Sequence, residues 1–246
     1  MNTLKIKGMK KQPKRITKMS MEAIMGRMEK MVAIREEYLK DVENVHIKLQ
    51  QGNSKTGKAC WTISLIPIAD CKNCSECKKK CYDIKNVCFQ PAVQNDRARN
   101  SALHKADPKR FWEEVDLQIK ANFVTELRIN VGGDLTDDDF IYVNQLAEKN
   151  PRTDILFFTK NYDGINRFLD KNKFHNNVSA IMSAWPGMEM DNPHKLPVSH
   201  VLFADGTTSA PEFGSYFCNG NCSECHFTGE GCWNLKKGES VIFPAH

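Results

Sequence analysis

The apolar positions near the start of the chain repeat with the period of an α-helix. Between residues 19 and 50, Met21, Ile24, Met25 and Met28 follow the i, i+3, i+4, i+7 spacing of one amphipathic face. Methionine readily fills irregular space in protein cores. The pattern therefore predicts a packing helix over residues 19–50, with its methionines in the core rather than bound to metal.

Beyond residue 50, short apolar runs alternate with helical patterns. A polar turn at 51–57 comes first, and its Gly-Lys-Thr residues lack the order of a phosphate-binding loop. Asp107 and Pro108 have the residue types of a helix N-cap and first turn. The expected strands are 61–66, 125–131, 154–159, 178–183 and 200–204, with 240–243 as a sixth candidate, and the expected helices are 91–104, 107–122, 137–149 and 164–171.

Strands that alternate with helices predict a parallel sheet. The expected fold class is therefore α/β, with a partial (βα) barrel or an open parallel sheet of five to six strands. In both architectures, sites gather at the carboxyl ends of the strands. Each expected strand end is polar or glycine-rich: residues 71–81, 130–134, 159–160, 183–185 and 205–206. One such loop alone could be ordinary helix capping, but their convergence predicts a functional edge.

Length and charge set the domain organisation. The 246 residues suit one domain, which we place at 19–246. Residues 1–18 carry seven Lys or Arg before the first acidic residue, Glu22, and are expected to form a flexible basic arm. Such an arm can contact nucleic acid or simply aid solubility.

The chain also lacks the sequence features of membrane insertion. No stretch reaches the roughly 20 apolar residues of a membrane span, and the first residues lack the apolar core of a signal peptide. We therefore expect a cytoplasmic protein without a membrane partner. In that reducing compartment, the ten cysteines are more naturally metal ligands or reactive thiols than disulfides.

Eight of the cysteines form two dense groups. The first group has the spacing CxxCxxCxxxC, which is used in iron–sulfur ligation. The second group has the spacing CxxxCxxCxxxxxxC and is too compact for a zinc ribbon with two separated knuckles. The predicted metal ligands are Cys71, Cys74, Cys77 and Cys81 in the first group and Cys218, Cys222, Cys225 and Cys232 in the second.

Residues beside the two groups leave alternatives open. Cys60 and Cys88 are spare ligands or buried thiols. His226 keeps zinc as an alternative to iron in the second group, and disulfides are a third reading. Lysines at 78–80 lie inside the first motif, where they would favour thiolates or form a solvated loop face.

Several short motifs follow one another over about residues 53–233: residues 53–57, Cys71, Cys77, Cys81 with Tyr82, residues 128–134, residues 157–160, and Cys222, Cys225, Cys232 with Trp233. In these motifs and their order, the chain resembles the gene-product-88-like proteins found in phages and prophages. The resemblance implies cluster binding and a phage origin in a bacterial host, with no named reaction. The family pattern has no counterpart of Cys74 or Cys60.

A more distant similarity is to radical S-adenosylmethionine enzymes, whose partial barrel has a cysteine loop after the first strand and a Gly-Gly-acid motif after the second. It implies that Gly132 and Gly133 let the methionine moiety approach the backbone and that Asp134 pairs with its ammonium group. It also implies a [4Fe–4S] cluster with one iron free of protein ligands. The superfamily's usual CxxxCxxC spacing, however, occurs at 218–225 rather than after the first strand.

Three functional hypotheses follow. The first is an enzyme of radical S-adenosylmethionine type with one or two [4Fe–4S] clusters. The second is an electron-transfer or redox-sensing protein with a reductant as partner and nucleic acid bound by the basic arm. The third is a protein with structural zinc.

Overall fold

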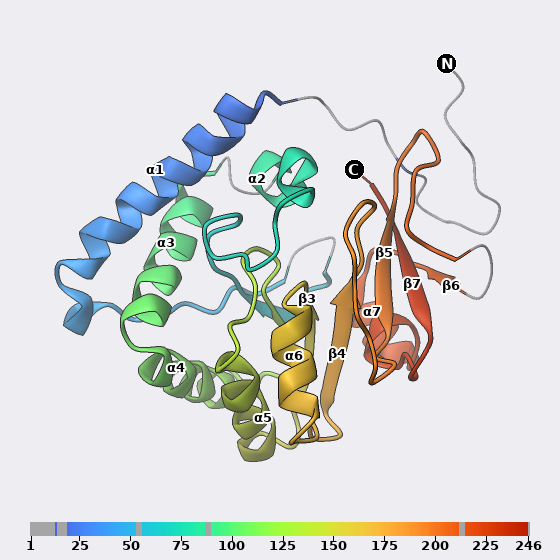
Figure 1. Ribbon diagram of the computed structural model, residues 1–246. Helices are drawn as coiled ribbons and strands as arrows, with labels where there is room; N and C mark the ends of the chain where they lie inside the picture. Colours follow the sequence, from blue (N-terminus) through green and yellow to red (C-terminus); the bar gives the residue numbers. More distant parts are fainter. Residues whose placement is uncertain (1–12, 14–18, 53–55, 87–89, 212–214, 246) are drawn as a thin grey trace.

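The computed structural model describes residues 13, 19–52, 56–86, 90–211 and 215–245. The predicted basic arm, apart from Pro13, lies outside this part of the chain, as does Cys88. The described residues form seven α-helices, three short 3₁₀ helices and seven strands (Figure 1). The helices are α1 (Met21–Leu39), α2 (Tyr82–Asn86), α3 (Pro91–Ala106), α4 (Pro108–Ala121), α5 (Asp139–Lys149), α6 (Tyr162–Leu169) and α7 (Cys222–Thr228), and the 3₁₀ helices are Val42–Asn44, Cys77–Lys80 and Gly231–Trp233.

All seven strands pair in parallel in one open sheet, with the order β1-β2-β3-β4-β5-β7-β6. The predicted α/β class and open parallel sheet are confirmed. The predicted number of strands was too low, because β6 has only three residues and carries almost no periodic signal. The strands are β1 (Cys60–Ile63), β2 (Glu126–Ile129), β3 (Asp154–Thr159), β4 (Val178–Ser183), β5 (Val198–Leu202), β6 (Ser215–Phe217) and β7 (Ser240–Pro244).

The first helix is shorter than predicted. Helix α1 ends at Leu39, and residues 45–50 are extended, with Val45, Ile47 and Leu49 buried in alternation. This period of two is the pattern of an extended segment, and the segment's backbone amides donate to side chains of α3 and α4. Helix α1 itself packs on α3 through Ile24 and Met31, which are fully buried, as expected for a packing helix, but Met21 is exposed and lies outside the core.

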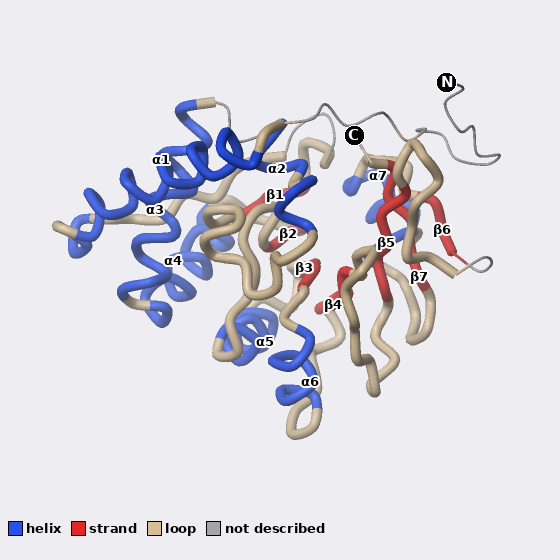
Figure 2. The backbone as a smooth tube through the Cα atoms, turned by 45° about the horizontal axis from the view of Figure 1, so that its top comes forward, coloured by secondary structure: helices blue, strands red, loops and turns tan. Residues whose placement is uncertain are grey.

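The two faces of the curved sheet are covered differently. Helices α3 to α6 cover the outer face, where Leu127 and Ile155 join the main core, while α7 lies on the inner face (Figure 2). The reason is the strand order. From β1 to β5, each strand lies beside the one before it in sequence, whereas β7 lies between β5 and β6, so the connection from β6 to β7 runs in the opposite direction across the sheet. A crossover that keeps the usual right hand then lies on the opposite face. This reversal brings the second cysteine group onto the inner face of the sheet.

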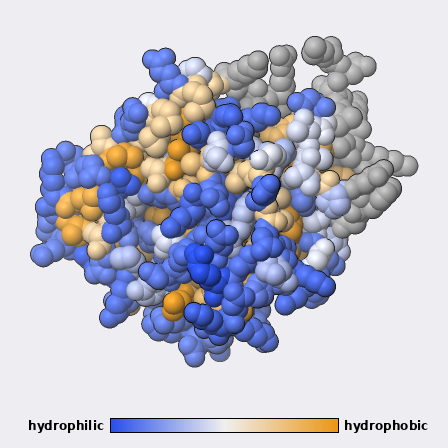
Figure 3. Space-filling model, viewed as in Figure 1, coloured by the Kyte–Doolittle hydropathy of each residue, from blue (hydrophilic) through white to orange (hydrophobic). Residues whose placement is uncertain are grey.

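The exposed side of the helical layer is polar. On the face seen in Figure 3, hydrophobic residues form small, separate groups among hydrophilic ones. No helix in the described ranges is both long enough and apolar enough to cross a membrane.

A buried carboxylate links three of the outer helices. Asp139 is fully buried at the start of α5 and accepts hydrogen bonds from His104 Nε2 (2.8 Å), Trp112 Nε1 (2.7 Å) and the backbone N of Thr136 (2.7 Å). Burial by itself opposes the charged form, but the hydrogen bonds from His104, Thr136 and Trp112 outweigh it and hold the pKa of Asp139 below its ordinary value.

We therefore expect Asp139→Asn to lower the free energy of unfolding by about 3 kcal/mol at pH 7, because a charged acceptor is lost. A depressed folded-state pKa stabilises the protein above the ordinary carboxyl pKa, and this contribution disappears as pH falls through the folded-state pKa. The difference between variant and wild type should therefore shrink in acid. Urea unfolding between pH 7 and pH 3 measures it, with Asp138→Asn, an exposed neighbour, as the control. Equal effects of the two substitutions would contradict this role.

Candidate metal centres on the inner face of the sheet

A cavity of about 1020 Å³ lies on the inner face of the sheet. Inward-facing residues of the strands form its wall, among them Thr62, Arg128 and Phe158. Residues from both cysteine groups also line it, so the fold brings together two segments about 150 residues apart in sequence. The cysteines on its wall are Cys71, Cys77, Cys81, Cys218, Cys222, Cys225 and Cys232.

The first group lies in the loop after β1, at the carboxyl edge of the sheet, as predicted. Asp70 holds this loop in place: its carboxylate accepts from the backbone N of Ile66 (2.7 Å) and its carbonyl from that of Asp134 (2.9 Å). The sulfur of Cys71 accepts a hydrogen bond from the backbone N of Ile68 (3.2 Å). The loop is thus fixed to the ends of both β1 and β2.

Cys74 differs from the other three cysteines of its group. It is not on the cavity wall, and its sulfur lies 3.7 Å from the carbonyl oxygen of Ile68. It is near Cys77, whose pKa it helps to raise. Three cysteines of this group thus line the cavity, and the fourth, Cys74, does not.

Lys160, directly after β3, is a cation that acts on two cysteines of the first group. Burial raises the pKa of both Cys71 and Cys77, and the positive charge of Lys160 acts against that increase. The lysines inside the motif have other partners: Lys79 pairs with Glu76 (3.0 Å), and Lys80 lies over the ring of Phe203 (3.9 Å). Lys160 was visible in the sequence as a strand-end residue but had no assigned role.

The Gly-Gly-Asp segment follows β2 and lines the cavity beside the first group. A Cβ atom on Gly132 would fall on the buried Arg97–Asp83 ion pair, and Gly133 has φ +84° and packs against Leu65. Close packing therefore requires both glycines, whether or not a ligand approaches them.

Asp134 is buried at the end of this segment. Its carboxylate accepts hydrogen bonds from Thr159 Oγ1 (2.7 Å) and from the backbone N of Lys160 and Leu135 (both 2.8 Å). Burial nevertheless raises the pKa of Asp134 above its ordinary value, and these donors only partly offset it. Since a carboxylate offers about four acceptor positions, roughly one remains for another donor.

Helix α7, which carries Cys222 and Cys225, lies at the amino ends of the first three strands. Ser223 of α7 donates to Glu126 (2.9 Å) and accepts from the backbone N of Cys60 (3.0 Å), while His226 contacts Asp154 (2.6 Å). Cys60, Glu126 and Asp154 are the first residues of β1, β2 and β3. The reversed crossover from β6 to β7 carries this helix there, whereas the first group lies at the carboxyl edge.

The four thiols of the second group are mutual neighbours. Burial raises the pKa of Cys225 to about 11, with further contributions from Cys218 and Cys222. The pKa of Cys232 is raised by burial and then by the other three cysteines. Because like charges repel, these four neighbouring thiols cannot all lose their protons without a positive charge beside them. Bound metal cations would supply that charge and make four thiolates favourable.

Two further residues contact Cys222 and were missed as functional residues. A hydrogen bond from Cys60 lowers the pKa of Cys222 to about 6, with help from the charge of Arg128. The Arg128 Nη1 lies 3.6 Å from the Cys222 sulfur. The sequence leaves Cys60 as a spare ligand or a buried thiol, and the structure buries it fully. Arg128 was only part of a family motif, since nothing in the local sequence of either residue links it to residue 222.

His226 is placed poorly for metal. Its Nε2 lies 2.6 Å from Asp154 and its Nδ1 3.4 Å from Glu126, so carboxylates occupy both ring nitrogens. The nine cysteines within the described ranges are all free thiols.

No three His, Cys, Asp or Glu side chains of the described residues converge tightly enough to hold a single metal ion.

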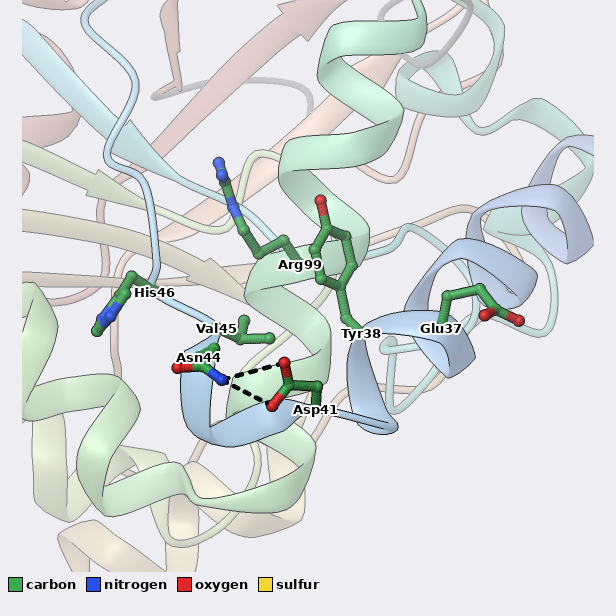
Figure 4. Close-up of a pocket in the computed structure, with 7 residues that line it drawn as sticks. All are labelled: Glu37, Tyr38, Asp41, Asn44, Val45, His46 and Arg99. Carbon is green, nitrogen blue, oxygen red and sulfur yellow. Dashed lines mark hydrogen bonds between the residues drawn. The ribbon is translucent and has the colours of Figure 1, made fainter.

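A second, smaller pocket of about 350 Å³ lies where α1 ends (Figure 4). It contains no cysteine, and two of its polar side chains have partners: Asn44 donates to Asp41 (2.9 Å), and Arg99 pairs with Asp96 (2.6 Å). We therefore place the candidate site in the large cavity.

The fold and cavity define an α/β protein with a parallel sheet and two cysteine-rich sites on its inner face. The family model of gene product 88 matches residues 39–201, about two thirds of the chain. The protein therefore belongs to the gene product 88 family. The match includes the first cysteine group and the Gly-Gly-Asp segment and ends before Cys218. No curated protein and no solved structure matches the chain.

Proposed function

We propose that the protein binds iron–sulfur clusters in two centres that share one cavity. Cys71, Cys77 and Cys81 would hold the first cluster and leave one iron without a protein ligand. The second would be held by Cys218, Cys222, Cys225 and Cys232. The observation that carries this proposal is that seven cysteine side chains from two distant segments line the same cavity.

The charges around the thiols support the proposal. Lys160 opposes the pKa increase of the first group, and Arg128 favours the thiolate of Cys222 in the second. Such cations would offset the negative charge of thiolate-ligated clusters. A zinc site that used His226 is disfavoured, because two carboxylates hold this ring.

We further propose that the protein is an enzyme of radical S-adenosylmethionine type. The support for this proposal is that Cys74 lies away from the cavity wall, so an iron of the first cluster would remain open to a ligand. Asp134, beside the first group, retains room for about one more donor, such as the ammonium group of S-adenosylmethionine. Gly132 and Gly133 would form the wall next to it. The cluster, when bound, would supply the electron for cleavage of the sulfonium.

Metal analysis tests the proposal. Protein purified without oxygen should be brown and contain about eight irons and eight sulfides per chain, as two [4Fe–4S] clusters require. Colourless protein with stoichiometric zinc and no sulfide would overturn it.

The proposed enzymatic activity has its own test. The same protein, reduced with dithionite, should cleave S-adenosylmethionine, and an iron-loaded protein that neither binds nor cleaves it would leave only an electron-transfer role. That role needs both clusters fully ligated, with Cys74 as the fourth ligand of the first.

A further inference from the structure

Two hydrogen-bond donors beside the cavity have no acceptor among the described residues. They are Nε of Arg128 and Nδ2 of Asn130, both buried. Arg128 belongs to β2, Asn130 directly follows the end of that strand, and both residues line the cavity. Buried donors are nearly always satisfied in folded proteins, so this pair calls for an explanation.

Arg128 carries a permanent positive charge that no described carboxylate pairs with. Its Nη1 faces Cys222 (3.6 Å), and its guanidinium lies over the ring of Phe158 (5.0 Å). Neither neighbour accepts from Nε. A guanidinium in a partly buried site is stabilised by an anion and suits carboxylate and phosphate in particular.

Asn130 shows two signs of a functional position. It is only 8% exposed, and it adopts φ 55°, the left-handed region that costs a non-glycine residue backbone strain. Its backbone N donates to the carbonyl of Ile63 (2.8 Å), which fixes it at the end of β2. Strained residues with unsatisfied polar groups cluster at ligand sites.

We propose that an oxyanion, the carboxylate or phosphate group of a small molecule, binds at Arg128 and Asn130 between the two cysteine groups. The inference rests on the proposed function in that this molecule would be a substrate or co-substrate in the cavity. Its donors, however, belong to the protein and do not require metal. The other cations on the cavity wall, such as Lys160 and Lys80, would favour the same charge.

Anion binding by the purified, anaerobic protein tests this inference. Calorimetric titration with inorganic phosphate and, separately, acetate should show saturable binding of at least one, at constant ionic strength set with chloride. Binding of only one of them identifies the group. The variants Arg128→Lys and Asn130→Gly should each weaken that binding by about tenfold or more, the loss expected for a hydrogen bond to a charged group.

Asn130→Gly keeps the experiment decisive if Arg128 variants do not fold, because glycine adopts φ 55° without strain. Arg152→Gln, an exposed change of charge, should leave the affinity unaltered. Absence of saturable binding by both anions, or wild-type affinity in Asn130→Gly, would overturn the inference. Iron content, measured on the same samples, tests the proposed function separately.

Discussion

Replacing Cys71 with serine should remove about half of the bound iron, whereas replacing Cys74 with serine should leave the iron content unchanged. Cys71 lines the cavity, and its sulfur is fixed by the backbone N of Ile68 (3.2 Å). Loss of this thiolate would leave the first cluster with too few ligands, while the second cluster remains. Cys74 is the matched control, since it belongs to the same loop but not to the cavity wall.

Iron and sulfide analysis of the two variants, with circular dichroism to verify folding, gives the answer. The reduced Cys74→Ser protein should keep the spectrum of the wild type. If Cys74→Ser loses as much iron as Cys71→Ser, the first cluster has four protein ligands and the electron-transfer role replaces the enzymatic one. Full iron in both variants would show that Cys71 is not a required ligand of the first cluster.

Gly132→Ala should lower the free energy of unfolding by about 3–5 kcal/mol, the usual cost of disrupting a buried ion pair. The added methyl group would occupy the position of the Arg97–Asp83 contact, whose side chains are 3% and 2% exposed. Neither group could move into solvent without leaving its partner. Urea unfolding at neutral pH measures the change.

Gly26→Ala is the matched control for this experiment. Gly26 lies within α1 with open space around it, so alanine there should stabilise the protein by about 0.5–1 kcal/mol. A Gly132→Ala variant as stable as the wild type would show that the ion pair adjusts easily. The glycine of the Gly-Gly-Asp segment would then need another explanation, such as close approach of a ligand.

Local sequence patterns predicted much of the secondary structure. Strands β3 and β4 have the predicted bounds, and Asp107 caps α4 by accepting from the backbone N of Arg110 (2.9 Å), as expected. These elements could be predicted because their periodicity and caps depend on neighbouring residues only. Strand β6 and the end of α1 could not, because short or extended segments are fixed by the partners they pack against.

The candidate site, too, was predictable from local sequence only in part. Cysteine spacing, read from the sequence alone, identified the two groups and predicted the place of the first at the carboxyl edge of the sheet. The second group's place on the inner face depends on the reversed step from β6 to β7, which no local pattern encodes.

The sequence by itself thus determined the α/β class, most of the helices and strands, and the two cysteine groups, because each is written in spacing along the chain. Only the tertiary structure decided that seven of the cysteines share one cavity, that Cys74 stands apart, and that Arg128 and Cys60 contact Cys222. The physical reason is that these relations depend on packing between residues up to 162 positions apart, which is set by strand order and the crossover and not by neighbours in sequence.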